Sequence, residues 1–130
     1  MSAIDRDEAR IDALVDALPL ERKIRLLSGE TTWTTYAEPA IGLRSIVMSD
    51  GPVGVRGLTW DERDTSHNVP SPTAMAASWD TGLVRRLARV LAGEARRKGV
   101  DVLLAPTVNL HRTPVGGRHF ECFSEDPLLT

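Results

Sequence analysis

Hydrophobic residues recur with a helical period near the start of the chain. Residues 5–18 carry apolar side chains at the i, i+3, i+4 and i+7 spacing of one helix face: Ile11, Leu14, Val15 and Leu18. Asp5 and Glu8 have the spacing of a capping box, and Pro19 cannot continue a helix. The pattern therefore predicts a first helix over residues 5–18.

Two further segments have helical periodicity. The stretch LERKIRLLSG, residues 20–29, predicts a short helix with Gly29 as its C-cap. The clearest helix is predicted over residues 79–99, where Asp80 is suited to the N-cap and Gly99 to the end. Its apolar face holds Leu83, Leu87, Val90 and Leu91.

Two apolar runs flank that long helix and are typical of buried strands. The first is Ser45–Met48, and the second begins at Val100 in the stretch VDVLLAPTVNL. Residues 57–78 are rich in glycine, proline, serine and asparagine, and we interpret them as a long loop. Strand, loop, helix and strand form a βαβ unit, whose two strands should be parallel with a right-handed crossover.

The end of the chain indicates that the fold continues. In SEDPLLT, residues 124–130, Asp126 is suited to an N-cap and Pro127 to the first position of a helix. Two parallel strands and one crossover helix do not cover both faces of a parallel sheet. We therefore expect the opening part of a larger α/β domain, with a helical lead-in and loop over 1–44 and the first βαβ unit over 45–130.

Composition narrows the possible partners. The chain has 130 residues, 42% of them hydrophobic and 26% charged, and a net charge of −2. This balance gives no electrostatic basis for binding nucleic acid or an anionic membrane, so we predict neither partner. The first ten residues are charged and lack the apolar core of a signal peptide, and Cys122 is the single cysteine. We therefore expect a cytoplasmic protein without an internal disulfide. The sequence does not indicate an oligomeric state.

Candidate chemistry gathers where the predicted strands end. Ligands of α/β sheets and barrels lie just beyond the carboxyl ends of the strands. Asp50 follows the first predicted strand, and Arg118 lies in the loop after the second. A carboxylate that accepts two hydrogen bonds and a guanidinium that donates a fork of them suit a polyhydroxylated ligand such as a sugar. The alternatives are an Asx turn at Asp50 and an ordinary surface role for Arg118.

Other reactive side chains give weaker signals. The glycines at 51, 54 and 57 match no phosphate-binding motif. His119 and Cys122 have the spacing of one metal-ligand pair, but zinc needs at least three protein ligands, so we predict no metal and no cofactor. The tryptophans could stack on sugar rings or lie in the core: Trp33, Trp60 and Trp79. Glu121 has no role that the sequence decides.

Two motifs together carry a family resemblance. S-D-G-P-x-G-V-R at Ser49–Arg56 and G-G-R-x-F-E-x-F-S-E-D-P at Gly116–Pro127 resemble the N-terminal domain of glycoside hydrolase family 3, with bacterial β-glucosidases as the nearest type. The resemblance implies the opening portion of a (β/α)8 TIM-type barrel and hydrolysis of β-glucosides with retention of configuration. It also implies that Asp50 binds sugar hydroxyls and that Arg56 and Arg118 line the same pocket.

The resemblance stops short of the catalytic pair. Retaining hydrolysis needs two carboxyl groups about 5 Å apart, one as nucleophile and one as acid/base. The family's Ser-Asp-Trp-like nucleophile motif, its Lys-His pair and its acid/base glutamate do not occur in these 130 residues. We therefore assign no catalytic residue and predict that the chain alone is inactive on a small-molecule or oligosaccharide β-glycoside. The alternative is a non-catalytic carbohydrate-binding or remnant fragment.

Overall fold

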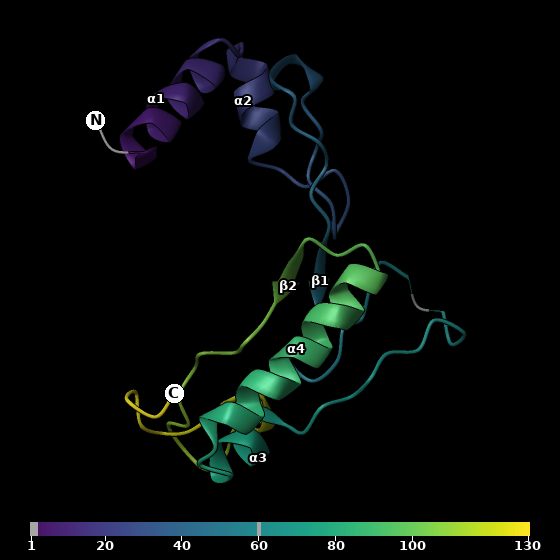
Figure 1. The fold of residues 1–130 in the computed structure, drawn as a ribbon, viewed down its shortest axis with the longest axis vertical. Coiled ribbons are helices and arrows are strands. Elements are labelled where there is room, and N and C mark those ends of the chain that lie inside the picture. Colours follow the sequence, from purple (N-terminus) through teal and green to yellow (C-terminus); the bar gives the residue numbers. More distant parts are fainter. Residues whose placement is uncertain (1–2, 60) are drawn as a thin grey trace. The chain divides into compact units, whose positions relative to one another are not determined.

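The computed structural model describes residues 3–59 and 61–130, and its two compact units are Met1–Val47 and Met48–Thr130 (Figure 1). The first unit holds α1 (Ala3–Asp16), α2 (Leu20–Leu26) and η1 (Pro39–Ile41). The second unit holds β1 (Met48–Asp50), α3 (Pro72–Ala77), α4 (Thr81–Arg97), β2 (Val102–Leu104) and η2 (His119–Glu121).

Both predicted helices of the first unit are present, but their ends differ from the prediction. α1 already begins at Ala3, two residues before the predicted start at Asp5, and the side chain of Asp5 lies outside the described part of the structure. α2 ends with Leu27 as its C-cap, and Gly29 instead forms an antiparallel bridge with Thr35. The C-cap prediction for Gly29 is therefore wrong, because the chain turns back on itself two residues earlier.

A buried carboxylate holds the loop of the first unit. Glu38 accepts hydrogen bonds from Arg22 Nη1 on both carboxylate oxygens, at 2.9 and 2.8 Å, and from the Ala40 amide at 3.1 Å. The hydrogen bond from Arg22 lowers the pKa of Glu38 despite the opposing effect of burial. Glu38 also pairs with Leu43 in an antiparallel bridge. The loop is therefore ordered by polar contacts with α2.

The second unit contains the predicted βαβ arrangement. β1 and β2 pair in parallel, with Met48 opposite Val102 and Asp50 opposite Leu104. The predicted strand over Ser45–Met48 is placed three residues too early. The backbone just before β1 pairs elsewhere, since Ile46 exchanges hydrogen bonds with Thr35 and Val47 forms a bridge with Thr34. Asp50 is consequently the last residue of the strand and does not follow it.

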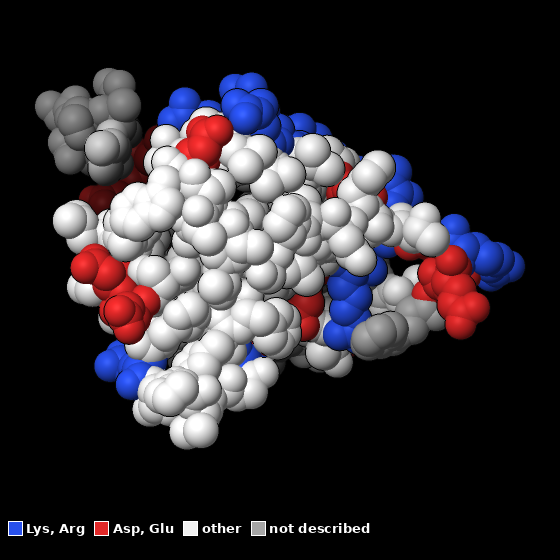
Figure 2. All heavy atoms as spheres, turned by 90° about the horizontal axis from the view of Figure 1, so that it is seen from below, with Lys and Arg blue, Asp and Glu red and all other residues white. Residues whose placement is uncertain are grey.

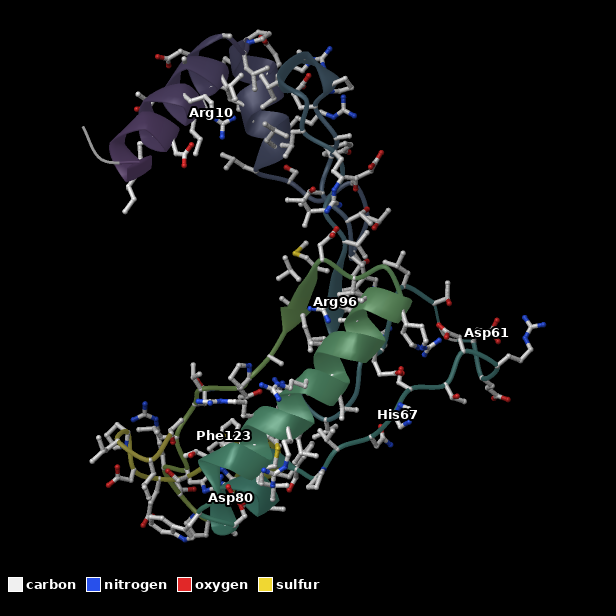
Figure 3. The ribbon with its side chains drawn as sticks, viewed as in Figure 1. Arg10, Asp61, His67, Asp80, Arg96 and Phe123 are labelled. Carbon is white, nitrogen blue, oxygen red and sulfur yellow. The ribbon has the colours of Figure 1, made fainter. Side chains whose placement is uncertain are left out.

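Local signals at both ends of α4 act as predicted. Asp80, labelled in Figure 3, accepts a hydrogen bond from the Leu83 amide at 2.9 Å. Lys98 is the C-cap, and Gly99 follows with a φ of 66°, a left-handed conformation that glycine adopts readily. Leu91 is buried, and the apolar side of α4 lines a hollow of about 430 Å³ together with Leu103 of β2.

A helix interrupts the segment that we interpreted as one long loop over residues 57–78. α3 is capped by Ser71, whose hydroxyl accepts a hydrogen bond from the Ala74 amide at 3.3 Å, and Pro72 occupies its first turn. The Thr73 hydroxyl donates to the Cys122 carbonyl at 2.7 Å. This contact joins α3 to the segment that contains η2.

The last residues form a turn. Asp126 Oδ1 accepts hydrogen bonds from the amides of Leu128 and Leu129, at 2.7 and 3.1 Å, so Asp126 caps the turn as predicted. The Thr130 amide donates to the Asp126 carbonyl at 3.0 Å, so residues 126–130 form one turn with the hydrogen bond of an α-helix, as expected for the first turn of a helix. None of the helices in the described part of the chain is both long and apolar enough to cross a membrane.

One face of the molecule is largely uncharged. Figure 2 shows this face, with most of its acidic and basic side chains toward the edges. Large apolar side chains of the second unit are exposed, among them Trp79, Val108, Val115, Phe120 and Leu128. Exposed apolar side chains that gather into one patch are typical of faces that contact another part of a protein.

Candidate functional site

A hollow of about 300 Å³ lies at the carboxyl ends of β1 and β2. The three residues predicted to bind a sugar all line it: Asp50, Arg56 and Arg118. Glu121, Phe120 and Thr107 also contribute to its wall. The two loops that carry these residues follow parallel strands, so they open at the same edge of the sheet.

Buried hydrogen bonds fix the backbone around Asp50. The fully buried Ser49 hydroxyl donates to the Asp50 carbonyl and accepts from the Gly57 amide, both at 2.8 Å. The Asp50 carbonyl also accepts from the Arg56 amide at 3.0 Å. A Cβ atom at Gly51 would lie 2.6 Å from the Gly54 carbonyl oxygen, so only glycine fits in this tight turn after β1. Asp50 is therefore held at the end of β1 by main-chain geometry.

The carboxylate of Asp50 faces two cations. Its Oδ2 lies 4.0 Å from Arg56 Nη1, and its side chain is 57% exposed. Its negative charge also contributes to raising the pKa of Arg118, after the larger effect of Glu121. An exposed carboxylate beside two guanidinium groups retains free capacity for hydrogen bonds from a ligand.

Arg118 is oriented by Glu121, the residue whose role the sequence left open. Nε and Nη2 of Arg118 donate to the two oxygens of Glu121, both at 2.7 Å. The Glu121 side chain is 12% exposed, whereas that of Arg118 is 83% exposed. The paired hydrogen bonds lower the pKa of Glu121 and raise the pKa of Arg118, against the opposing effect of burial on each. A near-buried carboxylate thus anchors a guanidinium at the mouth of the hollow.

The lowered pKa limits what Glu121 can do chemically. A general acid in a glycosidase needs a carboxyl group that stays protonated near neutral pH, which requires a raised pKa. Glu121 has the opposite shift because Arg118 stabilises its charged form. We therefore interpret Glu121 as an anchor for Arg118. The Arg-x-x-Glu spacing within residues 118–121 is the one sequence signal that could have indicated this pair.

Histidine and cysteine side chains hold the same loop together. His111 Nε2 makes a hydrogen bond of 2.8 Å with the His119 carbonyl, and His119 Nε2 contacts the Thr113 carbonyl. Cys122 is buried, and its thiol contacts the Arg118 carbonyl at 3.8 Å. Within residues 3–59 and 61–130, no group of three or more His, Cys, Asp or Glu side chains is arranged to hold a metal ion.

The described tryptophans are not among the residues that line this hollow. Trp79 is 77% exposed and lines a different hollow, next to Phe123. Trp33 is half-buried in the first unit. Trp60 lies outside the described residues.

Comparison with known proteins decides the family. The family model described as "Glycosyl hydrolase family 3 N terminal domain" matches residues 28–130. The chain belongs to glycosyl hydrolase family 3. Its relatives include "Beta-glucosidase B" of Emericella nidulans, 46% identical over 123 residues that cover 95% of this chain and 15% of that protein. A "Beta-glucosidase" of Rhizobium radiobacter is 45% identical over 123 residues, 92% of this chain and 15% of that protein.

Solved structures of β-glucosidases have the same local fold. A β-glucosidase from Kluyveromyces marxianus in complex with glucose matches with a TM-score of 0.86 and 37% identity, over 92% of this chain and 14% of that one. β-glucosidase 3B from Thermotoga neapolitana in complex with glucose matches with a TM-score of 0.81 and 32% identity, over 92% of this chain and 19% of that one. The chain thus spans about 15% of the length of the curated relatives that it matches.

The Arg118–Glu121 pair predicts a pH-dependent contribution to stability. Because the folded-state pKa of Glu121 lies below its ordinary value of 4.5, the pair stabilises the fold fully above pH 4.5 and less as the pH falls through the folded pKa. Glu121→Gln should therefore lower Tm most above pH 4.5, and its Tm should converge on the wild-type value in acid. Thermal unfolding from pH 7 to pH 2 measures this difference.

The matched control is Glu125→Gln, which makes the same chemical change at an exposed position. Its Tm should follow the wild-type value at every pH. A Tm difference for Glu121→Gln that stays constant with pH would contradict the assigned charge state.

Proposed function

We propose that the protein to which this chain belongs is a glycoside hydrolase that cleaves β-glucosides, and that this chain supplies part of its glucose-binding subsite. The observation that carries the proposal is the meeting of Asp50, Arg56 and Arg118 around one hollow at the carboxyl ends of two parallel strands. Relatives named β-glucosidase, and family 3 structures described as complexes with glucose, support the same substrate class.

The side chains around the hollow suit a sugar ring. The Asp50 carboxylate can accept hydrogen bonds from two neighbouring hydroxyl groups, while Arg56 and Arg118 donate hydrogen bonds in fixed directions. Hydrogen bonds in which one partner is charged are stronger than hydrogen bonds between neutral groups. The charged side chains of this hollow can therefore bind a neutral sugar tightly through its hydroxyl groups. The expected substrate is a small-molecule or oligosaccharide β-glycoside.

We infer that β1, α4 and β2 form the opening portion of a (β/α)8 barrel. The parallel pairing of β1 with β2 across a helical crossover is the repeating unit of that fold. TM-scores of 0.86 and 0.81 to family 3 β-glucosidases support this architecture. In a complete barrel, further strands and helices would cover the apolar side of α4 and the exposed apolar residues of the second unit.

The catalytic pair has no candidate among the residues of this site. The Asp50 carboxylate is exposed and lies 4.0 Å from Arg56 Nη1, and Glu121 is held in its charged form by Arg118. A retaining glycosidase needs one ionised carboxylate as nucleophile and one protonated carboxyl group as general acid, on either side of the glycosidic bond. Asp50 and Glu121 do not form such a pair. We therefore place the nucleophile and the acid/base outside this chain, and expect hydrolysis with retention of configuration. A cytoplasmic location and the absence of nucleic-acid and membrane partners stay predictions from composition.

The whole protein should hydrolyse an aryl β-glucoside, and Asp50→Asn should lower kcat/KM roughly 100-fold or more, because it removes charged hydrogen bonds to the sugar. Release of the chromophoric aryl group measures both values. Asp61→Asn is the matched control, since Asp61 pairs with Arg63 and does not line the hollow around Asp50. The control should keep kcat/KM within about twofold.

Two outcomes would contradict the proposal. One is a wild-type protein without turnover on aryl β-glycosides. The other is an Asp50→Asn variant that retains the activity of Asp61→Asn, which would remove Asp50 from the sugar site.

The 130-residue chain by itself should show no turnover of the same substrate, because it lacks the covalent route through a nucleophile. The measurement is the same aryl β-glucoside assay with the purified chain at high concentration. Turnover that Asp50→Ala abolishes would show that a catalytic carboxylate does lie within this chain.

A further inference from the structure

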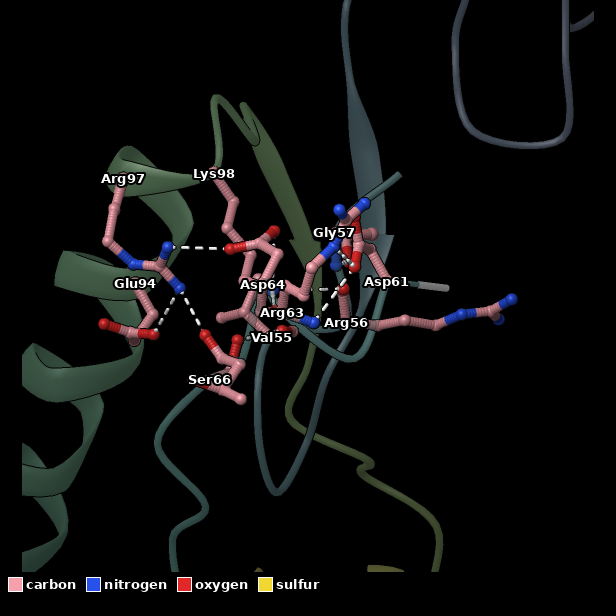
Figure 4. A network of polar contacts seen from close by, with 12 residues as sticks. Val55, Arg56, Gly57, Asp61, Arg63, Asp64, Ser66, Glu94, Arg97 and Lys98 are labelled. Carbon is pink, nitrogen blue, oxygen red and sulfur yellow. Dashed lines mark hydrogen bonds and ion pairs between the residues drawn. The ribbon is translucent and has the colours of Figure 1, made fainter. Parts of the chain in front are cut away.

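Lys98 carries a buried ammonium group at the end of α4. Its side chain is 4% exposed, and its Nζ lies close to three oxygen atoms (Figure 4). These are the Asp64 carbonyl at 2.6 Å, Asp64 Oδ2 at 3.1 Å and the Arg56 carbonyl at 3.4 Å. An ammonium has three N–H donors, so each can be directed to one acceptor. Such complete pairing is what allows a lysine charge to be buried.

One of those acceptors belongs to a residue of the sugar site. Arg56 lines the hollow with Asp50 and Arg118, whereas Lys98 lines a separate polar hollow of about 380 Å³ that Arg56 also borders. Arg56 thus lies between the two hollows. Lys98 contacts the Arg56 main chain and lines only the second of these hollows.

The backbone on both sides of Arg56 is tethered as well. The Ser66 hydroxyl donates to the Val55 carbonyl at 2.6 Å, and the Gly57 amide donates to the buried Ser49 hydroxyl at 2.8 Å. The Lys98 stem also packs on Gly57, because a Cβ atom there would lie 3.1 Å from Lys98 Cδ. Together with these contacts, Lys98 fixes the main chain of residues 55–57 and so the position of the Arg56 Cα atom.

The neighbouring Arg97 makes similar contacts with a different part of the loop. It donates to Asp64 Oδ1 at 2.8 Å, to the Thr65 carbonyl and to Glu94 Oε2 at 3.0 Å. The hydrogen bond from Arg97 is the main cause that lowers the pKa of Glu94 to about 2. Arg97 and Lys98 thus share the Asp64 carboxylate, but Arg97 donates its hydrogen bonds to residues 64, 65 and 94 and Lys98 donates to the Arg56 carbonyl.

We propose that Lys98 is a positioning residue of the glucose subsite, which holds the main chain of Arg56 so that the Arg56 guanidinium meets the sugar. This inference rests on the proposed function. Lys98 would act on ligand binding through Arg56 and would not touch the substrate. Displacing the Arg56 guanidinium would weaken binding of the substrate and of the transition state by the same amount. The loss of Lys98 should therefore raise KM and leave kcat unchanged.

The test uses Lys98→Met in the whole protein, since methionine preserves the buried stem and removes the ammonium. We expect KM for an aryl β-glucoside to rise roughly tenfold while kcat stays within about twofold. Arg97→Met is the matched control, with the same loss of a cation from Asp64, and its KM should stay within about twofold. In an Arg56→Ala background, Lys98→Met should raise KM no further, because its effect passes through Arg56.

A second readout does not depend on catalysis. Hydrogen exchange at the amides of Arg56 and Gly57 should become roughly tenfold faster or more in Lys98→Met and unchanged in Arg97→Met. Asp64→Asn is the second variant should Lys98→Met fail to fold. It removes the only negative charge among the three acceptors of the Lys98 ammonium, and it should change KM and exchange in the same direction by a smaller factor.

Three results would overturn the proposal: unchanged exchange at Arg56 and Gly57, an equal rise of KM in Arg97→Met, or an additive effect in the Arg56→Ala background. A wild-type protein without activity on β-glucosides would instead contradict the proposed function. In that case the exchange measurement still decides whether Lys98 positions Arg56.

Discussion

The parallel pairing of β1 with β2 is the constraint on which the candidate site depends. Asp50 ends β1 opposite Leu104, so the segment after each strand leaves the sheet at the same edge. Fully buried Ser49 then ties the end of β1 to Gly57. A change in register would move Asp50 to the other side of the sheet, because side chains alternate along a strand.

Charge pairing determines which groups stay available in the hollow. Glu121 engages the guanidinium of Arg118 with two short hydrogen bonds, and Asp50 lies at ion-pair distance from Arg56. The two pairs differ in which side chain is buried. In the first pair the carboxylate of Glu121 is largely buried, whereas in the second pair the carboxylate of Asp50 is more than half exposed. The structure therefore separates an anchoring carboxylate from a carboxylate that remains open to a ligand.

Sequence patterns predicted the elements whose signals are local. α4 has a long apolar period, a capping aspartate at 80 and a left-handed glycine at 99. The helix and both end signals are confirmed, but Val90 of the predicted apolar face is 41% exposed. β1 was placed too early because a strand of three residues is defined by its partner and not by its own composition. α3 was missed because six residues are too few for a clear period, although Ser71 and Pro72 together are a local start signal. The Glu121 anchor was left undecided because its role depends on loop geometry around Arg118.

The central claim is that Asp50, Arg56 and Arg118 surround a bound sugar. The most direct measurement is a crystal structure of the whole protein with glucose. The account predicts that two neighbouring hydroxyls of glucose lie within hydrogen-bond distance of the Asp50 carboxylate, with the guanidinium groups of Arg56 and Arg118 in the same pocket. Glucose bound elsewhere, or bound with Asp50 turned away from it, would contradict the account.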